Sequence, residues 1–342
     1  MIFWWFIPTV CGLSFVLTAV LRRYALARSM LDVPNDRSSH TVPTPRGGGV
    51  SIVVTFLISL AVMWGWELVD SRFFFGAAGA GLLVAAVGFM DDHGHIAARW
   101  RLLGHFAGAA WVLVWTGGLA PIEVAGMVLN LRWAGDFFAL FYLVWLLNLY
   151  NFMDGIDGIA SVEAICVCLG ACLLYWVSGH QDLIWAPLLL SMSVFGFLFW
   201  NFPPAKIFMG DAASGFLGII MGVLSLQATA VEPRFLWVWL ILLGVFIVDA
   251  TFTLLRRLLR GDKVYEAHRS HAYQYASRKH GRHLPVTTAV ALINVFWLLP
   301  LALCVTSFGL DGALGVVMAY IPLLVIAVRY HAGEVEVLTV KR

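Results

Sequence analysis

Long apolar runs recur along the whole chain and are separated by short polar segments. The runs are continuous over roughly 16–23 residues and do not alternate, which favours membrane-spanning helices over the strands of a barrel. A helix satisfies its own backbone hydrogen bonds inside lipid. We therefore predict about ten or eleven spanning helices. Their expected ranges are 2–21, 49–66, 73–90, 103–119, 137–152, 160–177, 183–200, 214–230, 235–255, 286–308 and 312–328.

Composition places most of the chain in lipid. Of its 342 residues, 61% are hydrophobic and 12% are charged, whereas soluble domains carry about 25% charged residues. The five cysteines all fall inside apolar runs and form no C-x-x-C pair, so we expect neither disulfides nor a zinc site. The apolar start lacks the charged segment of a signal peptide and predicts a retained helix. The sequence thus predicts an all-α polytopic integral membrane protein, with residues 1–342 forming a single transmembrane domain.

The basic residues predict the orientation of the chain. If the N-terminus lies outside, 19 of the 22 Lys and Arg residues fall in inner segments, and Arg72, Arg132 and Arg234 fall outside. The positive-inside rule therefore favours an outer N-terminus and a cytoplasmic C-terminus. We expect the Pro- and Gly-rich segment 31–49 to be an inner loop. The alternating segment 122–133 favours a small β-hairpin at the outer surface.

Aspartates that are far apart in sequence fall together at the predicted cytoplasmic ends of the helices. These residues are Asp91, Asp92, Asp154, Asp157 and Asp211. Carboxylates near an apolar boundary repel one another unless a cation compensates, and hard oxygen ligands without a nearby thiol suit Mg²⁺ or Mn²⁺. The alternative is that they are ordinary helix caps or solvated loop charges. Their gathering at one face favours a functional site.

Amide side chains accompany two of these aspartates. Asn148, Asn151 and Asp154 recur every three residues, which keeps them near one helical face. The dipeptides at Asp154-Gly and Asp157-Gly then end the helix. This arrangement favours a site for a metal-bound diphosphate, and the alternative is a helix C-terminus capped by glycines.

Two basic segments are candidates for binding anions. The inner loop at 256–284 carries eight basic residues and four histidines. For His268, Arg269 and His271 we favour contact with nucleotide phosphates, since the H-x-x-H spacing is weak for zinc. Arg46 precedes three glycines at the start of a predicted helix. Those glycines either present N–H groups to an anion or merely shape the entry of the helix.

The motifs in this order resemble those of the polyprenyl-phosphate N-acetylhexosamine-1-phosphate transferases, which form glycosyltransferase family 4. The resemblance extends from the segment 31–40 to the loop around His271. It is most specific at Asp91-Asp92, at the run from Asn148 to Gly158, and at Phe208-Met-Gly-Asp211. It implies transfer of N-acetylhexosamine-1-phosphate from a UDP-sugar of the GlcNAc or FucNAc type to undecaprenyl phosphate. UMP would be released at the cytoplasmic side of a bacterial inner membrane.

The resemblance also implies roles for individual residues. Asp211 is similar to the family's Mg²⁺ ligand. Asp91 and Asp92 are similar to a pair of catalytic aspartates, which are assigned either to contact with the metal or to removal of a proton from the lipid phosphate. Of the two, we expect Asp92 to contact the metal. Asp154 and Asp157 match the central catalytic motif. The expected substrate-binding residues are Asn148, Asn151, Asn201, Lys206, His268, Arg269, His271 and Arg46.

Departures from the family pattern narrow the expected branch. His95 stands where many members have Lys, and Tyr273 stands where His is frequent. These changes resemble the branch that initiates O-antigen of lipopolysaccharide rather than the phospho-MurNAc-pentapeptide transferases, which remain the alternative. A transporter using Glu163 and Asp249 is an alternative of another class. The expected partners are the two substrates and the bilayer, with no nucleic acid, and a homodimer is compatible with the sequence.

Overall fold

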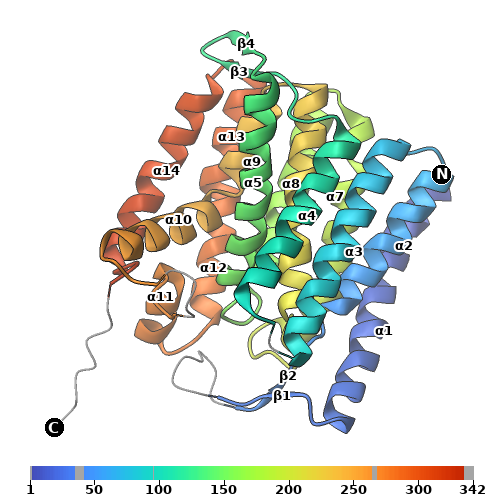
Figure 1. Cartoon of the computed structure of the whole chain (residues 1–342), viewed down its shortest axis with the longest axis vertical. Helices are drawn as coiled ribbons and strands as arrows, with labels where there is room; N and C mark the ends of the chain where they lie inside the picture. The colour runs from blue at the N-terminus through green and yellow to red at the C-terminus, as the bar shows by residue number, and fades with distance from the viewer. Residues whose placement is uncertain (1, 35–41, 95, 264–267, 335–342) are drawn as a thin grey trace.

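The computed structural model describes residues 2–34, 42–94, 96–263 and 268–334, and it is a bundle of helices (Figure 1). Predictions that concern Arg37, His40, His95, Lys341 and Arg342 lie outside the described residues. The helices are α1 (Phe6–Ala27), α2 (Val50–Gly65), α3 (Ser71–Gly94), α4 (Ala98–Thr116), α5 (Arg132–Met153), α6 (Ile159–Val177), α7 (Trp185–Asn201), α8 (Asp211–Val231), α9 (Phe235–Leu242), α10 (Gly244–Leu259), α11 (Ala272–His280), α12 (Leu284–Ile293), α13 (Leu299–Ser307) and α14 (Gly312–Arg329).

Every predicted spanning segment contains a helix, and the chain is an all-α polytopic membrane protein. Eight of the described helices are long and apolar enough to cross a membrane, counting α12 and α13 as one helix joined through the π-helical turn Asn294–Leu298. The predicted span 235–255 is broken, because α9 and α10 meet at an angle of 71°. Two further predicted spans are not among the eight. The helix α2 is too short, with 16 residues. The helix α4 begins with two arginines, which lower its mean hydropathy. All five cysteines are free.

The helix α8 lies at the centre of the bundle and packs most extensively against α3 and α5 (Figure 1). Glycines on α8 allow this close approach. A Cβ atom added at Gly218 would lie 2.5 Å from the backbone oxygen of Leu146 on α5. Because 83% of its apolar window is buried inside the protein, α8 is a core helix that other helices shield from lipid.

Two short strand pairs mark the opposite ends of the bundle. The strands β3 (Ile122–Val124) and β4 (Met127–Leu129) form the predicted antiparallel hairpin, and α5 begins directly after it at Arg132. The strands β1 (Leu31–Asp32) and β2 (Thr44–Pro45) pair across the predicted loop at the other end. That end also carries α11, and we call it the site end (Figure 1). The side of the membrane that it faces stays a prediction from the basic residues.

Candidate active site

The aspartate pair stands at the site end of α3 and meets the start of α8. The helix α3 continues to Gly94, so Asp91 and Asp92 lie in its last turn rather than after it. Asp92 accepts hydrogen bonds from the backbone N–H groups of Asp211 at 3.0 Å and Ala212 at 3.2 Å. A carboxylate at a helix N-terminus satisfies free N–H groups and opposes the positive end of the helix dipole. Asp92 therefore caps α8 and fixes where Asp211 lies.

Arg46 joins the two carboxylates of this pair of helices. Its Nη2 atom lies 2.7 Å from Asp92 Oδ1 and 2.9 Å from Asp211 Oδ1. The glycines after Arg46 are used inside the protein, because the N–H groups of Gly48 and Gly49 donate to the backbone oxygens of Phe208 and Met209. The structure therefore favours the interpretation in which these glycines shape the helix entry, while Arg46 supplies positive charge to the site.

Asp154 follows the end of α5 and faces the same cluster. Burial raises the pKa of Asp154 well above its ordinary value, and the carboxylates of Asp211 and Asp92 add to this effect. Asn151, one turn earlier, donates a hydrogen bond to the Ser214 hydroxyl on α8 at 3.1 Å. The side chain of Asn148 donates to the oxygen of Val144 in its own helix. The cluster thus sets three carboxyl groups, those of Asp92, Asp154 and Asp211, near the guanidinium group of Arg46.

Asp157 lies to one side of the cluster, in a turn that is tied to the segment after α7. Its carboxylate is 3.1 Å from Nδ1 of His283 and accepts the N–H of Ala205 at 3.0 Å. The buried side chain of Asn201 accepts the N–H of Gly158 and donates to the oxygen of Ile207. Asn201 therefore supports the turn through backbone contacts, and its predicted contact with a substrate stays a prediction.

Lys206 is placed away from the carboxylates. Its side chain is exposed, and its ammonium group lies 5.6 Å from the ring centroid of Trp200. Its backbone oxygen accepts a hydrogen bond from Arg22 on α1. The structure brings the Lys206 side chain to the α1–α7 side of the site end, and a role with substrate stays a prediction.

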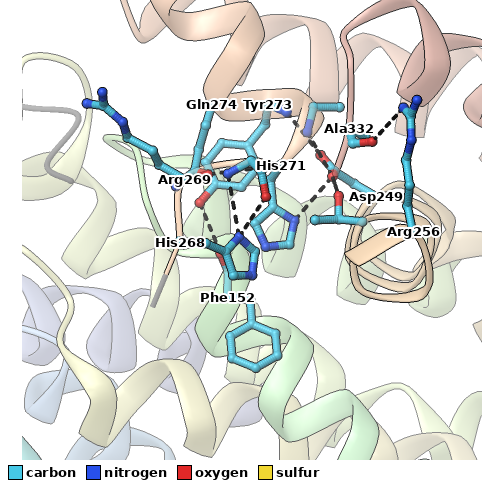
Figure 2. Close-up of polar contacts among 12 residues, drawn as sticks. Phe152, Asp249, Arg256, His268, Arg269, His271, Tyr273, Gln274 and Ala332 are labelled. Atoms are coloured by element: carbon cyan, nitrogen blue, oxygen red, sulfur yellow. Dashed lines mark hydrogen bonds and ion pairs between the residues drawn. The ribbon is translucent and has the colours of Figure 1, made fainter. Parts of the chain in front are cut away.

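The predicted histidine segment packs against the end of α5 (Figure 2). The ring of His271 lies nearly parallel to the ring of Phe152, with centroids 6.4 Å apart, and also to that of His268 at 4.9 Å. Burial, with positive charge at His271 and Arg257, lowers the pKa of His268 to about 3. His268 is therefore neutral near pH 7. Figure 2 shows the side chain of Arg269 directed away from these rings.

A cavity of about 440 Å³ opens beside the cluster, between α3, α4, α5, α8 and α10. Apolar side chains such as Val84, Phe106 and Trp145 form most of its wall. Its polar lining residues are Asp91, Arg101, His105, Asn148, Asn151 and Asp211. Arg101 is one of the basic residues that the sequence predicts only as part of the inner positive charge, yet its Nη1 atom lies 2.6 Å from Asp91 Oδ2. The sequence offered one signal for this contact, the position of Arg101 one helical turn into α4.

The donor set suits a hard divalent cation, although the described residues contain no ready-made group of three or more His, Cys, Asp or Glu ligands. The oxygen atoms come from Asp211 and Asp154, and no thiol lies among them. Burial and, after it, the like charges of Asp211 and Asp92 raise the pKa of Asp154, and a bound cation would relieve that repulsion. Asp92 has N–H donors on both oxygens and Arg46 beside it, so its predicted metal contact stays a prediction.

Comparison with known proteins places this geometry in a family. The sequence model described as glycosyl transferase family 4 matches residues 74–229, which include both the aspartate pair and the start of α8. A probable undecaprenyl-phosphate N-acetylglucosaminyl 1-phosphate transferase of Bacillus subtilis is 30% identical, over 75% of this chain and 72% of its own length. An undecaprenyl-phosphate alpha-N-acetylglucosaminyl 1-phosphate transferase of Thermotoga maritima is 30% identical, over 85% and 87%.

A third relative carries the name of the alternative activity. The phospho-N-acetylmuramoyl-pentapeptide-transferase of Streptococcus pneumoniae is 27% identical, over 65% of this chain and 71% of its own length. The resemblance inferred from the sequence motifs is thereby confirmed at the level of the family. The chain belongs to glycosyl transferase family 4, among the polyprenyl-phosphate N-acetylhexosamine-1-phosphate transferases.

Proposed function

We propose that this protein transfers N-acetylhexosamine-1-phosphate from a UDP-sugar to undecaprenyl phosphate and releases UMP. One observation carries the proposal: an apolar cavity opens directly onto Asp91, Asn151 and Asp211 at the end of the bundle. Such a cavity suits a polyprenyl chain, whose phosphate would then lie beside the polar wall. The names of the Bacillus and Thermotoga relatives favour a donor of the GlcNAc type.

The reaction joins two phosphates. A phosphate oxygen of the lipid attacks the β-phosphorus of the UDP-sugar, and the bond from that phosphorus to the bridging oxygen breaks. UMP leaves with the electron pair of that bond. Arg46 opposes the charge of the donor at one side, and Arg101 opposes that of the lipid phosphate in the cavity. Holding both substrates against fixed helix ends supplies proximity and orientation.

A magnesium ion would be held by Asp211 and Asp154. When bound, Mg²⁺ would neutralise the charge that develops on the diphosphate. Asp91 pairs with Arg101, and it acts by holding that cation at the wall of the cavity.

The two remaining functional classes differ in what they require. The alternative of a phospho-MurNAc-pentapeptide transferase keeps the reaction and changes the sugar. Entry of the product into O-antigen rests on the sequence departures at His95 and Tyr273. The transporter alternative needs free carboxylates within the bundle. Asp249 instead accepts bonds from the start of α11. Glu163 accepts a hydrogen bond from Asn294 at 2.7 Å on one oxygen, while its other oxygen is buried without a hydrogen-bond partner.

The test is release of UMP by purified protein supplied with undecaprenyl phosphate, Mg²⁺ and a panel of UDP-sugars. The panel holds UDP-GlcNAc, UDP-FucNAc and UDP-MurNAc-pentapeptide. Asp211→Asn should abolish release while the protein stays folded. Asp70→Asn is the matched control, because Asp70 caps α3 at the opposite end of the bundle. Near-normal release by Asp211→Asn, or no release by wild-type protein with any donor, would refute the proposal.

A further inference from the structure

The carboxylate of Asp249, on the neighbouring helix α10, holds the histidine segment in place (Figure 2). Asp249 stands on α10 and is 7% exposed. Its oxygens accept the backbone N–H groups of Ala272 at 2.9 Å and Tyr273 at 3.0 Å, at the first turn of α11. The hydroxyl of Thr253, one turn later on α10, donates to it at 3.2 Å. Asp249 thus caps α11 from another helix and fixes where α11 begins.

The same carboxylate holds the ring of His271. Nδ1 of His271 lies 3.2 Å from Oδ1 of Asp249, and His271 is only 2% exposed. An ionised carboxylate only accepts hydrogen bonds, so the contact requires the proton to be on Nδ1. The other ring nitrogen, Nε2, then carries no hydrogen and is left to meet a ligand.

The position of α11 is in turn transmitted to the carboxylate cluster. The hydroxyl of Tyr273 donates to the backbone oxygen of Phe152 at 2.9 Å. Gly155, next to Asp154, lies so close that a Cβ atom there would be 2.1 Å from the Tyr273 hydroxyl oxygen. The first turn of α11 therefore rests on the turn that presents Asp154, and His271 is held at a set distance from it.

We propose that Asp249 is a positioning residue, which fixes the proton of His271 on Nδ1 and so leaves Nε2 to accept a hydrogen bond from a hydroxyl or amide group of the UDP-sugar. The inference rests on the proposed function. A residue that only capped α11 would not affect one substrate alone. The inference instead predicts that Asp249 affects binding of the UDP-sugar and does not affect binding of the lipid substrate. Partners that orient a metal-binding histidine in this way typically change affinity or activity by about 10–100-fold when removed, and we expect an effect of similar size here.

The first experiment compares Asp249→Asn with a matched control. Asparagine keeps the size of the side chain but replaces one accepting oxygen with a donor. The control is Asp311→Asn, because Asp311 also accepts backbone N–H groups on both oxygens, from Leu314 and Ala125 at the far end of the bundle. We expect Asp249→Asn to raise KM for the UDP-sugar about 10–100-fold and to leave KM for undecaprenyl phosphate unchanged. Asp311→Asn should change neither KM.

The second experiment tests the coupling between Asp249 and His271. If Asp249 acts through the ring, Asp249→Asn combined with His271→Ala should bind the donor no more weakly than His271→Ala alone. Two effects that add in full would overturn the inference, because a cap that only stabilises α11 acts independently of the ring. An unchanged KM for the donor in Asp249→Asn would overturn it as well.

A spectroscopic measurement separates this inference from the proposed function. In protein labelled with ¹⁵N-histidine, the His271 signals are identified by their loss in His271→Ala. We expect a proton on Nδ1 in wild-type protein and a mixture of tautomers in Asp249→Asn. An unchanged spectrum would overturn the role of Asp249 even if UMP is released. If the spectrum of Asp249→Asn changes as expected but wild-type protein releases no UMP, the proposed function is refuted and the role of Asp249 is not.

Discussion

Arg46 holds the carboxylates of α3 and α8 together, and its removal should weaken both the fold and the site. The change to examine is Arg46→Met, which keeps the length of the side chain and removes its charge. Arg46 lies within 3 Å of both partners, at 2.7 Å from Asp92 and 2.9 Å from Asp211. The Asp92 side chain is 4% exposed, so water cannot replace the lost cation there.

The magnitude follows from the burial of the partners. Removing one member of a buried ion pair costs about 3–5 kcal/mol. The Arg46 side chain is itself 35% exposed, so solvent already screens part of the interaction. Asp92 also keeps the N–H groups of Asp211 and Ala212. We therefore expect a loss of about 2 kcal/mol, which for a chain of this size lowers Tm by about 3–6 °C.

The assay is the thermal unfolding of detergent-purified protein, followed by tryptophan fluorescence with and without MgCl₂. Because Arg46→Met leaves the carboxylates uncompensated, Mg²⁺ should raise the Tm of the variant more than that of the wild type. Arg99→Met is the control, since Arg99 is an exposed arginine at the same end that lies over Trp100. A Tm for Arg46→Met equal to that of Arg99→Met, or an identical Mg²⁺ response in variant and wild type, would refute the reasoning.

Three further changes test the surroundings of the site. Gly88→Ala should lower the free energy of unfolding by about 1–3 kcal/mol and lower Tm, because the new Cβ would lie 2.5 Å from a backbone oxygen of α8. Gly94→Ala is the control, because a Cβ atom there meets open space. Equal Tm values for the two variants would contradict this account of packing. Glu163→Gln should keep the contact with Asn294 and near-normal UMP release, whereas a loss of release would assign the charge of Glu163 a function. Because the pKa of His268 is lowered to about 3, its neutral form is favoured in the folded state, and stability falls as the pH drops below the ordinary value of about 6.5. His268→Gln should therefore reduce the fall in Tm between about pH 7 and pH 5, and an unchanged fall would show that other groups cause it.

The positions of the helices could be predicted from the sequence because continuous apolar runs leave the backbone in lipid no other choice. The gathering of Asp92, Asp154 and Asp211 could also be predicted, since the distribution of basic residues places all three of these helix ends on the same side of the membrane. The partners of these residues could not. Arg46 reaches Asp92 and Asp211 only because Gly88 lets α3 approach the start of α8 closely, and no local pattern reports that distance.

The role of Asp249 was missed for a related reason. As an acidic residue within an apolar run, it suggested a coupling site in a transporter. Its partners, however, lie on α11, which reaches it only because α10 turns away from α9 by 71°. The apolar run continues unbroken through this bend, so hydropathy alone predicted one straight span. Figure 1 shows α10 crossing the direction of the neighbouring helices.

The central place of α8 has a consequence for how the protein is made. Its main neighbours, α3 and α5, precede it in the chain, so a nascent polypeptide leaving the ribosome has already produced the walls that receive it. Asp92, Asp154 and Asp211 can therefore come together while the C-terminal third is still being translated. The segment around His271 is made after all three, and a chain released early by the ribosome would hold the carboxylates without the histidine segment that packs against the end of α5.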